Sequence, residues 1–222
     1  WKIFSYYKEQ DRLFAAYEKA GIAQGDNFVN MAGKTVKFNR ETVSDEAASI
    51  VRNNIPNYAY VSDFVKGLRQ YPVGNFVSFP AEIMRTGTNI VQRGLDEIFY
   101  SVKVGKNTVN PLRNIGLTRL LGMGVTTSVI PYAAVSAGQA LYDISRDELE
   151  AIKRYVPKWS KNSTIIPLKG DDGKFKYIDF SHMNAYDTLT RPIQTVINKV
   201  QAGEQDKDGI MDVFILGLFE ST

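Results

Sequence analysis

Residues 120–142 read LLGMGVTTSVIPYAAVSAGQALY, a run of 23 residues without a charged side chain. A helix of this length would span the hydrocarbon core of a bilayer. The run is nevertheless diluted by Thr, Ser and Gln, is rich in Gly and Ala, and contains Pro131 near its middle. Small residues favour close helix contacts both in membranes and in soluble cores.

This run therefore has two interpretations. The first, which we favour for the folded chain, is a buried pair of soluble helices hinged near Pro131. The second is a segment that enters a membrane conditionally, as part of an oligomer whose polar groups face a lumen. The residues that would contact lipid in the second case are Leu120, Val125, Val129, Ile130, Pro131, Val135 and Leu141.

A basic stretch precedes the uncharged run. Residues 101–119 contain no acidic residue and carry four basic ones, Lys103, Lys106, Arg113 and Arg119. These side chains are candidate contacts for phosphates or anionic headgroups. A solvated basic loop explains the same composition equally well.

Helical periodicity dominates the N-terminal half of the chain. It predicts helices over residues 3–20, after a capping pattern at residues 42–45 and up to Pro56, over residues 61–70, and from Ser78 to Tyr100 with Pro80 in the first turn. In the last of these, Glu82 and Arg85 are predicted to form a structural pair, and Arg93 and Glu97 a solvated pair.

The C-terminal part combines helices with one strand pair. Ser145 begins a capping box for a helix that ends near Tyr155, and further helices are expected over residues 189–202 and 209–219. Asp172-Gly173 between two alternating runs predicts a hairpin near residues 164–180. The expected fold is therefore mainly α with one small β-hairpin. Its three segments are residues 1–70, 71–142 and 143–222, and the whole is expected to be a fragment of a much larger chain.

Composition argues against much of enzyme chemistry. The 222 residues include no Cys and one His, so thiolate metal sites, cysteine nucleophiles and multi-histidine sites are excluded. Phosphate-binding loops and nucleophile elbows are missing from the sequence. The surroundings of His182, next to Ser181, are more typical of a turn than of a catalytic site. We expect no catalytic residue, no metal and no cofactor. With 27 Lys and Arg against 24 Asp and Glu, the chain is only mildly basic.

Two strings resemble a known family. One is YPVGNFVSFPAEIMRT, residues 71–86, and the other is YVPKWSKNS, residues 155–163, followed by YIDFS at 177–181. Both are similar to segments of the internal virion, or ejection, proteins of tailed bacteriophages. The residues that carry the first likeness are Asn75, Phe76, Phe79, Pro80, Glu82 and Arg85.

The resemblance implies a capsid-packaged structural protein that helps to carry the genome across the host envelope. It implies other virion proteins and copies of the same chain as partners, together with genomic DNA and, after ejection, the host membrane. Its expected location is the virion interior and later the host envelope. One alternative is an accessory domain of a large virion enzyme, an RNA polymerase or a lytic transglycosylase, whose active site lies elsewhere. Another is an ordinary cytoplasmic helical interaction protein.

Overall fold

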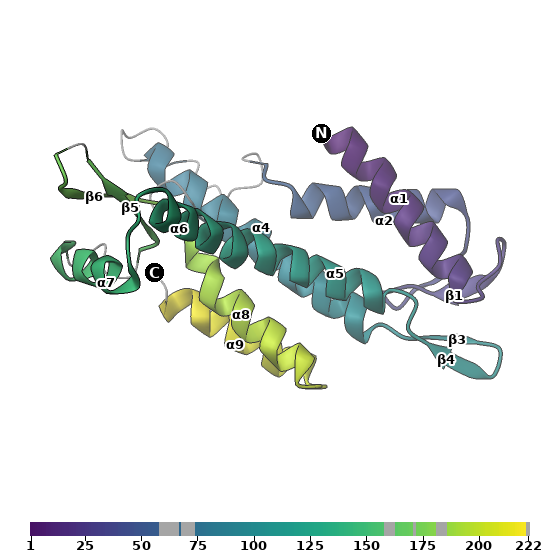
Figure 1. Cartoon of the computed structure of the whole chain (residues 1–222). Helices are drawn as coiled ribbons and strands as arrows, with labels where there is room; N and C mark the ends of the chain where they lie inside the picture. Colours follow the sequence, from purple (N-terminus) through teal and green to yellow (C-terminus); the bar gives the residue numbers. More distant parts are fainter. Residues whose placement is uncertain (58–66, 68–73, 158–162, 171, 181–185, 221–222) are drawn as a thin grey trace.

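The computed structural model of the chain is about 65% helical and elongated (Figure 1). It describes residues 1–57, 67, 74–157, 163–170, 172–180 and 186–220, with side chains described from residue 81 onward in the second long range. The mainly α fold with a small hairpin at 164–180, predicted from the sequence, is confirmed. The predicted helix over residues 61–70, apart from Gly67, and His182 lie outside the described residues.

One end of the molecule is built from two helices and two short hairpins. Helices α1 (Lys2–Lys19) and α2 (Arg40–Asn54) flank β1 (Asn27–Val29) and β2 (Thr35–Lys37), which pair antiparallel. The second hairpin, β3 (Val102–Val104) with β4 (Asn107–Val109), returns to the same end from a later part of the chain. Their shared core centres on three packed rings, Tyr17, Phe28 and Phe38.

The middle of the molecule is a helical bundle. It contains α4 (Gly74–Phe99), α5 (Arg113–Gly124), α8 (Thr190–Gln201) and α9 (Lys207–Glu220). A 3-10 turn at Asp187–Leu189 leads into α8. The core combines residues 83–98 and 120–123 with residues 189–218, so segments far apart in sequence share one apolar cluster.

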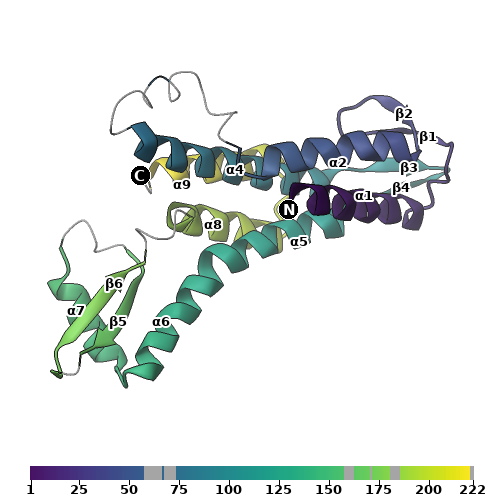
Figure 2. The same cartoon turned by 90° about the horizontal axis from the view of Figure 1, so that it is seen from above.

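A small unit lies at the other end. The π-helical turn η2 (Val125–Val129) and α6 (Ile130–Leu141) continue α5 as one helix from Arg113 to Leu141. Figure 2 shows this helix leading away from the bundle to α7 (Arg146–Tyr155), β5 (Ile165–Lys169) and β6 (Phe175–Asp179). Gly138 of α6 lies against β5, where an added Cβ would approach Ile166 and the Pro167 carbonyl to 2.9 Å. The unit has a small core of Ile144, Ile152, Val156 and Ile165.

Several sequence expectations for local structure are confirmed. Ser145 and Glu148 form the predicted capping box of α7. Asp172-Gly173 lies in the β5–β6 turn, where Gly173 takes a positive φ of 72° that a residue with a Cβ rarely adopts. Gly203, with φ of 82°, follows the end of α8 as predicted.

Other expectations are wrong. The cap of α2 is Asn39, whose side chain accepts from the Thr42 amide at 2.8 Å, because the helix begins before the pattern at residues 42–45. Helix α4 begins at Gly74 instead of near Ser78, so Pro80 lies inside it and removes one backbone hydrogen bond without ending it. Hairpins β1–β2 and β3–β4 are additional to the one expected, since strands of three residues carry too little alternation to be recognised.

Candidate functional site

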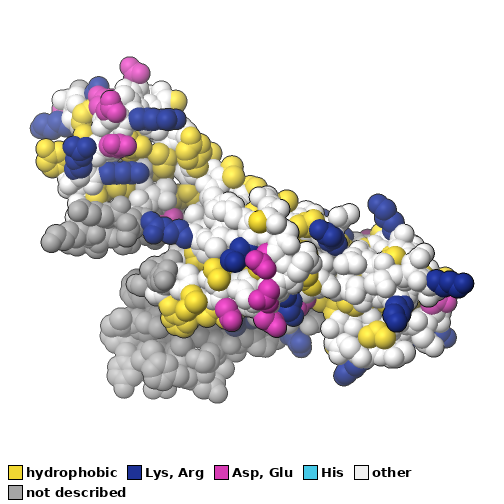
Figure 3. All heavy atoms as spheres, turned by 90° about the horizontal axis from the view of Figure 1, so that it is seen from below, with side chains coloured by type: hydrophobic (Ala, Val, Ile, Leu, Met, Phe, Trp, Pro, Cys, Tyr) yellow, Lys and Arg dark blue, Asp and Glu magenta, His cyan; other side chains and the backbone are white. Residues whose placement is uncertain are grey.

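The most distinctive surface of the chain is an apolar strip along the helix from Arg113 to Leu141. We define this apolar strip by six large side chains that are each 47–79% exposed: Leu121, Val125, Val129, Ile130, Tyr132 and Leu141. Figure 3 shows apolar and uncharged atoms on the arm that joins the bundle to the small end unit. The strip is therefore a stretch of uncharged helix that the fold leaves open to solvent.

The strip corrects the favoured interpretation of residues 120–142. These residues form neither a helix pair hinged at Pro131 nor a buried element, because only 28% of the most apolar window of this helix is buried. Of the predicted lipid contacts, Val125, Val129, Ile130 and Leu141 are exposed, Val135 is half-buried, and Leu120 and Pro131 are buried. Leu121 and Tyr132 were missed, although Leu121 is four residues before Val125 and shares its helical face.

Small residues explain why only one side of the helix is buried. Gly116 of α5 meets Gly94 of α4 so closely that an added Cβ at Gly116 would lie 2.4 Å from the Gly94 carbonyl oxygen. Gly124 is similarly tight against Ile197 of α8. Leu120, Met123 and the glycines thus face the bundle, and the larger branched side chains on the opposite side have no partner in the described structure.

The helix passes Pro131 without a break because a neighbour replaces the lost hydrogen bond. In an α-helix the amide of residue 131 would donate to the carbonyl of Thr127, but proline has no amide hydrogen. The Thr190 hydroxyl at the start of α8 donates to that carbonyl instead, at 2.8 Å. The π-helical turn just before Pro131 widens the backbone at this point. Together these two features keep a continuous helix where the sequence predicted a hinge.

The basic stretch divides into exposed and buried members. Lys103, Lys106 and Arg113 are exposed on the β3–β4 hairpin and at the start of α5. Arg119 is only 10% exposed, and its guanidinium binds the carboxylates of Glu97, at 2.9 and 3.0 Å, and Glu9, at 3.1 Å. Arg119 is thus a structural residue, and its assignment as a contact for anionic partners is wrong.

Arg119 belongs to a buried ionic network that joins four helices. Glu97 is fully buried and also pairs with Arg93 at 2.7 Å, which corrects the expectation of a solvated pair. Arg93 in turn binds Glu46 of α2, and Glu46 accepts from Tyr17 of α1 at 3.2 Å. Burial alone would lower the pKa of Arg119, but Glu97 and Glu9 raise it above its usual value. Each of the three carboxylates contacts one or both of the two guanidiniums, so the network holds α1, α2, α4 and α5 together.

The predicted pair of Glu82 and Arg85 is present and extends further than expected. Arg85 donates to Glu82 at 2.8 Å, and the Asn57 amide also donates to this buried carboxylate. Although burial would raise the pKa of Glu82, these donors lower it below its usual value. The pair therefore ties the chain after α2 to α4. Asn75, Phe76, Phe79 and Pro80 lie in the first turns of α4, and their side chains are outside the described part.

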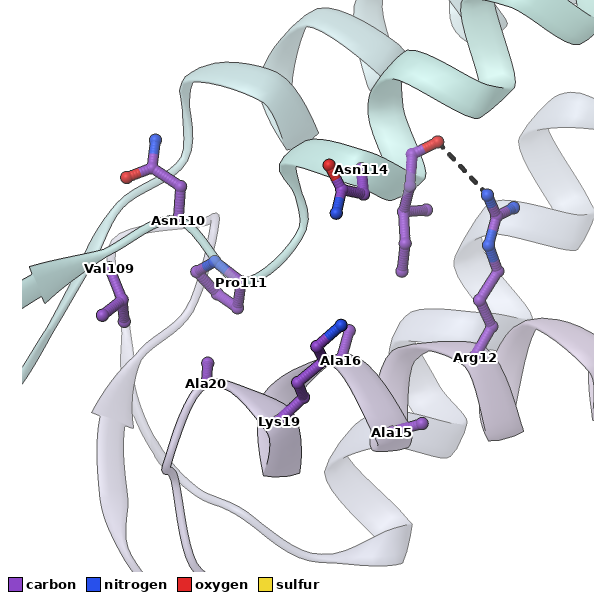
Figure 4. Close-up of a pocket in the computed structure, with 10 residues that line it drawn as sticks. Arg12, Ala15, Ala16, Lys19, Ala20, Val109, Asn110, Pro111 and Asn114 are labelled. Atoms are coloured by element: carbon purple, nitrogen blue, oxygen red, sulfur yellow. Dashed lines mark hydrogen bonds between the residues drawn. The ribbon is translucent and has the colours of Figure 1, made fainter.

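Two surface hollows carry no arrangement typical of catalysis. Figure 4 shows the first, about 380 Å³ between α1 and the start of α5, where Arg12 donates to the Ile115 carbonyl at 3.4 Å. The second, about 660 Å³, lies beside α6 and is lined by Tyr132, Arg146, Glu150 and Lys153 among others. Within the described residues, no three His, Asp or Glu side chains are grouped to hold a metal ion.

Comparisons with protein-family models, curated proteins and solved structures gave no match for this chain. By length and composition, the helix Arg113–Leu141 is long and apolar enough to cross a membrane, and it is the one such helix within the described residues. The apolar strip on this helix is accordingly the candidate functional site.

Proposed function

We propose that this chain is a structural part of a tailed-phage internal virion protein, and that it contacts lipid and further copies of itself through the apolar strip during genome ejection. The observation that carries the proposal is the exposure of the six strip residues on an uncharged helix. The resemblance of residues 71–86 and 155–163 to ejection proteins supports the same interpretation. In this role the chain is non-enzymatic, resides in the virion, and later reaches the host envelope.

The free energy of apolar burial favours a partner that covers the apolar strip. Full burial of a Val, Leu, Ile or Phe side chain is worth about 1.5–3 kcal/mol relative to full exposure. Six side chains that are 47–79% exposed therefore leave a gain of several kcal/mol to any surface that covers them. Exposed apolar side chains gathered along one helix are typical of protein or membrane contact sites.

Several features favour lipid over a water-soluble protein as the partner of the apolar strip. The uncharged run is long enough for the hydrocarbon core, and Tyr142 near its end is a residue type that favours the membrane interface. Near Pro131 the Thr127 carbonyl accepts a hydrogen bond from the Thr190 hydroxyl, and an apolar surrounding requires such internal partners. Lys103, Lys106 and Arg113, all exposed, are available for anionic headgroups or for the phosphates of genomic DNA.

Flotation of the whole 222-residue chain with liposomes tests the proposal. We expect the wild-type chain to float and Val129→Arg to lose about a hundredfold in partitioning, because a charge at the centre of a span costs about 2.5–3.5 kcal/mol. Val129 is 53% exposed, so the substitution leaves the fold intact.

Thr118→Arg is the matched control. Thr118 is exposed on the same helix but precedes the uncharged run. We expect this variant to float like the wild type. A wild-type chain that stays in the aqueous fraction with both neutral and anionic lipid contradicts the lipid contact.

A further inference from the structure

The start of α1 is a second exposed apolar surface, separate in sequence from the strip. Trp1 is 90% exposed, and Ile3, Phe4 and Tyr7 are each more than half exposed. Their spacing of three and four residues places Phe4 beside Trp1 and Tyr7 on the helix surface. We define these four residues as the aromatic end of α1.

The charges around the aromatic end have one sign. Lys2 and Lys8 are exposed, and the first acidic residue of the chain is Glu9. The first turn of α1 contains no acidic residue. Further along α1, the apolar side chains of Leu13 and Tyr17 are buried in the core.

Helix α1 contacts α5 just before the uncharged run begins. Glu9, the residue after Lys8, binds Arg119, and Leu120 starts the run. Arg12 contacts the Ile115 carbonyl, so α1 and α5 run antiparallel at their contact. From there the start of α1 extends away from β1–β4 (Figure 1).

Trp and Tyr prefer the headgroup level of a bilayer, where the ring is buried and its polar atom stays wet. Lysine side chains extend along apolar surface and place their charge at anionic headgroups. A short helix with this composition lies in the plane of the interface instead of crossing it. We propose that the aromatic end of α1 is an interfacial anchor that binds the headgroup region of an anionic bilayer. The inference rests on the proposed lipid contact of the strip.

Fluorescence of Trp1 tests the anchor directly. The chain contains two tryptophans, so Trp159→Phe, at a position outside the described residues, leaves Trp1 as the single emitter. On addition of phosphatidylcholine–phosphatidylglycerol vesicles we expect a blue shift of the Trp1 emission, and stronger quenching by lipids brominated near the headgroup than by lipids brominated near the chain end. We expect pure phosphatidylcholine vesicles to give a smaller shift.

A charge at the aromatic end should weaken binding. We expect Phe4→Glu to lower vesicle partitioning at least tenfold, and Ala15→Glu, at an exposed position in the second half of α1, to leave it unchanged. Phe4 is 64% exposed and an acidic residue in the first turn is favourable, so the fold is not affected.

The outcomes separate the anchor from the strip. Flotation of the chain without a Trp1 shift overturns the anchor and leaves the proposed function intact, whereas no flotation and no shift overturn both. Equal effects of Phe4→Glu and Ala15→Glu also overturn the anchor. So does a change in the sedimentation of Phe4→Glu without vesicles, because it would identify another protein copy as the occupant.

Discussion

At the scale of single residues, the role of a charged side chain in this protein depends on its burial and not on its position in the sequence. Arg113 and Arg119 are six residues apart in one basic stretch, yet Arg113 is exposed and Arg119 is enclosed by Glu97 and Glu9. Removing one member of a buried ion pair leaves the partner charge without compensation. The two arginines should therefore respond very differently to the same substitution.

We expect Arg119→Met to lower the free energy of unfolding by about 3–5 kcal/mol, because Glu9 would lose its partner and the buried Glu97 would keep only Arg93. Arg113→Met, at an exposed position of the same helix, should change it by less than about 0.5 kcal/mol. Urea denaturation of the two variants beside the wild type measures both values. A cost for Arg119→Met as small as that for Arg113→Met would mean that the guanidinium is solvated and available to an anionic partner.

Sequence reasoning could not find this network because its members are remote from one another. Arg119 and Glu97 are 22 residues apart, and Glu9 is 110 residues from Arg119. Only the Arg93–Glu97 spacing of four is visible in the sequence, and that spacing alone is typical of a solvated pair. The burial of Glu97 follows from the close approach of Gly94 and Gly116, which is a tertiary event.

At the scale of elements, hydrophobic periodicity identifies the helices well. It does not predict that the helix beginning at Arg113 continues through Pro131. The patterns in residues 3–20, 145–155 and 189–202 agree with α1, α7 and α8, since each buries one face on a core. A hinge is expected at Pro131 because its missing amide is evident from sequence, whereas the compensating Thr190 hydroxyl lies 63 residues from Thr127. For a related reason the sequence predicts that residues 120–142 are buried. Composition does not show which side of a helix packs against another element.

The role of Thr190 in this helix is testable. We expect Thr190→Val to cost about 1–3 kcal/mol of unfolding free energy, because it removes the hydroxyl that donates to the carbonyl of the buried Thr127. Thr195→Val, which removes an exposed hydroxyl from the same helix α8, should change stability by less than about 0.5 kcal/mol. Thermal and urea unfolding measure both.

A double-mutant cycle with Pro131→Ala isolates the bond. The substituted residue would supply its own amide to the Thr127 carbonyl, so Thr190→Val should cost clearly less in the Pro131→Ala background. An equal cost in both backgrounds would place the contribution of Thr190 elsewhere.

At the scale of the whole molecule, the helix from Arg113 to Leu141 joins parts of very different core size. The bundle core draws on four helices, whereas the unit of α7, β5 and β6 has a core cluster of four residues and packs against α6, where Gly138 lies close to β5. Small cores open at lower free energy than large ones, and they do so as local cooperative units. The apolar strip therefore lies between a stable body and a part that is easier to open.

Hydrogen exchange resolves the two parts. We expect Ile165→Ala, which empties a fully buried position of the small core, to lose about 2–5 kcal/mol locally and to speed amide exchange in α7, β5 and β6 while exchange in α4 stays unchanged. Val91→Ala, at a fully buried position of the bundle, should instead speed exchange throughout the bundle. If Ile165→Ala accelerates exchange in α4 as strongly as in β5, the molecule opens as one cooperative unit. In that case α7, β5 and β6 could not move aside unless the bundle unfolded as well. Lipid would then have to cover the apolar strip without any rearrangement at the α6 end.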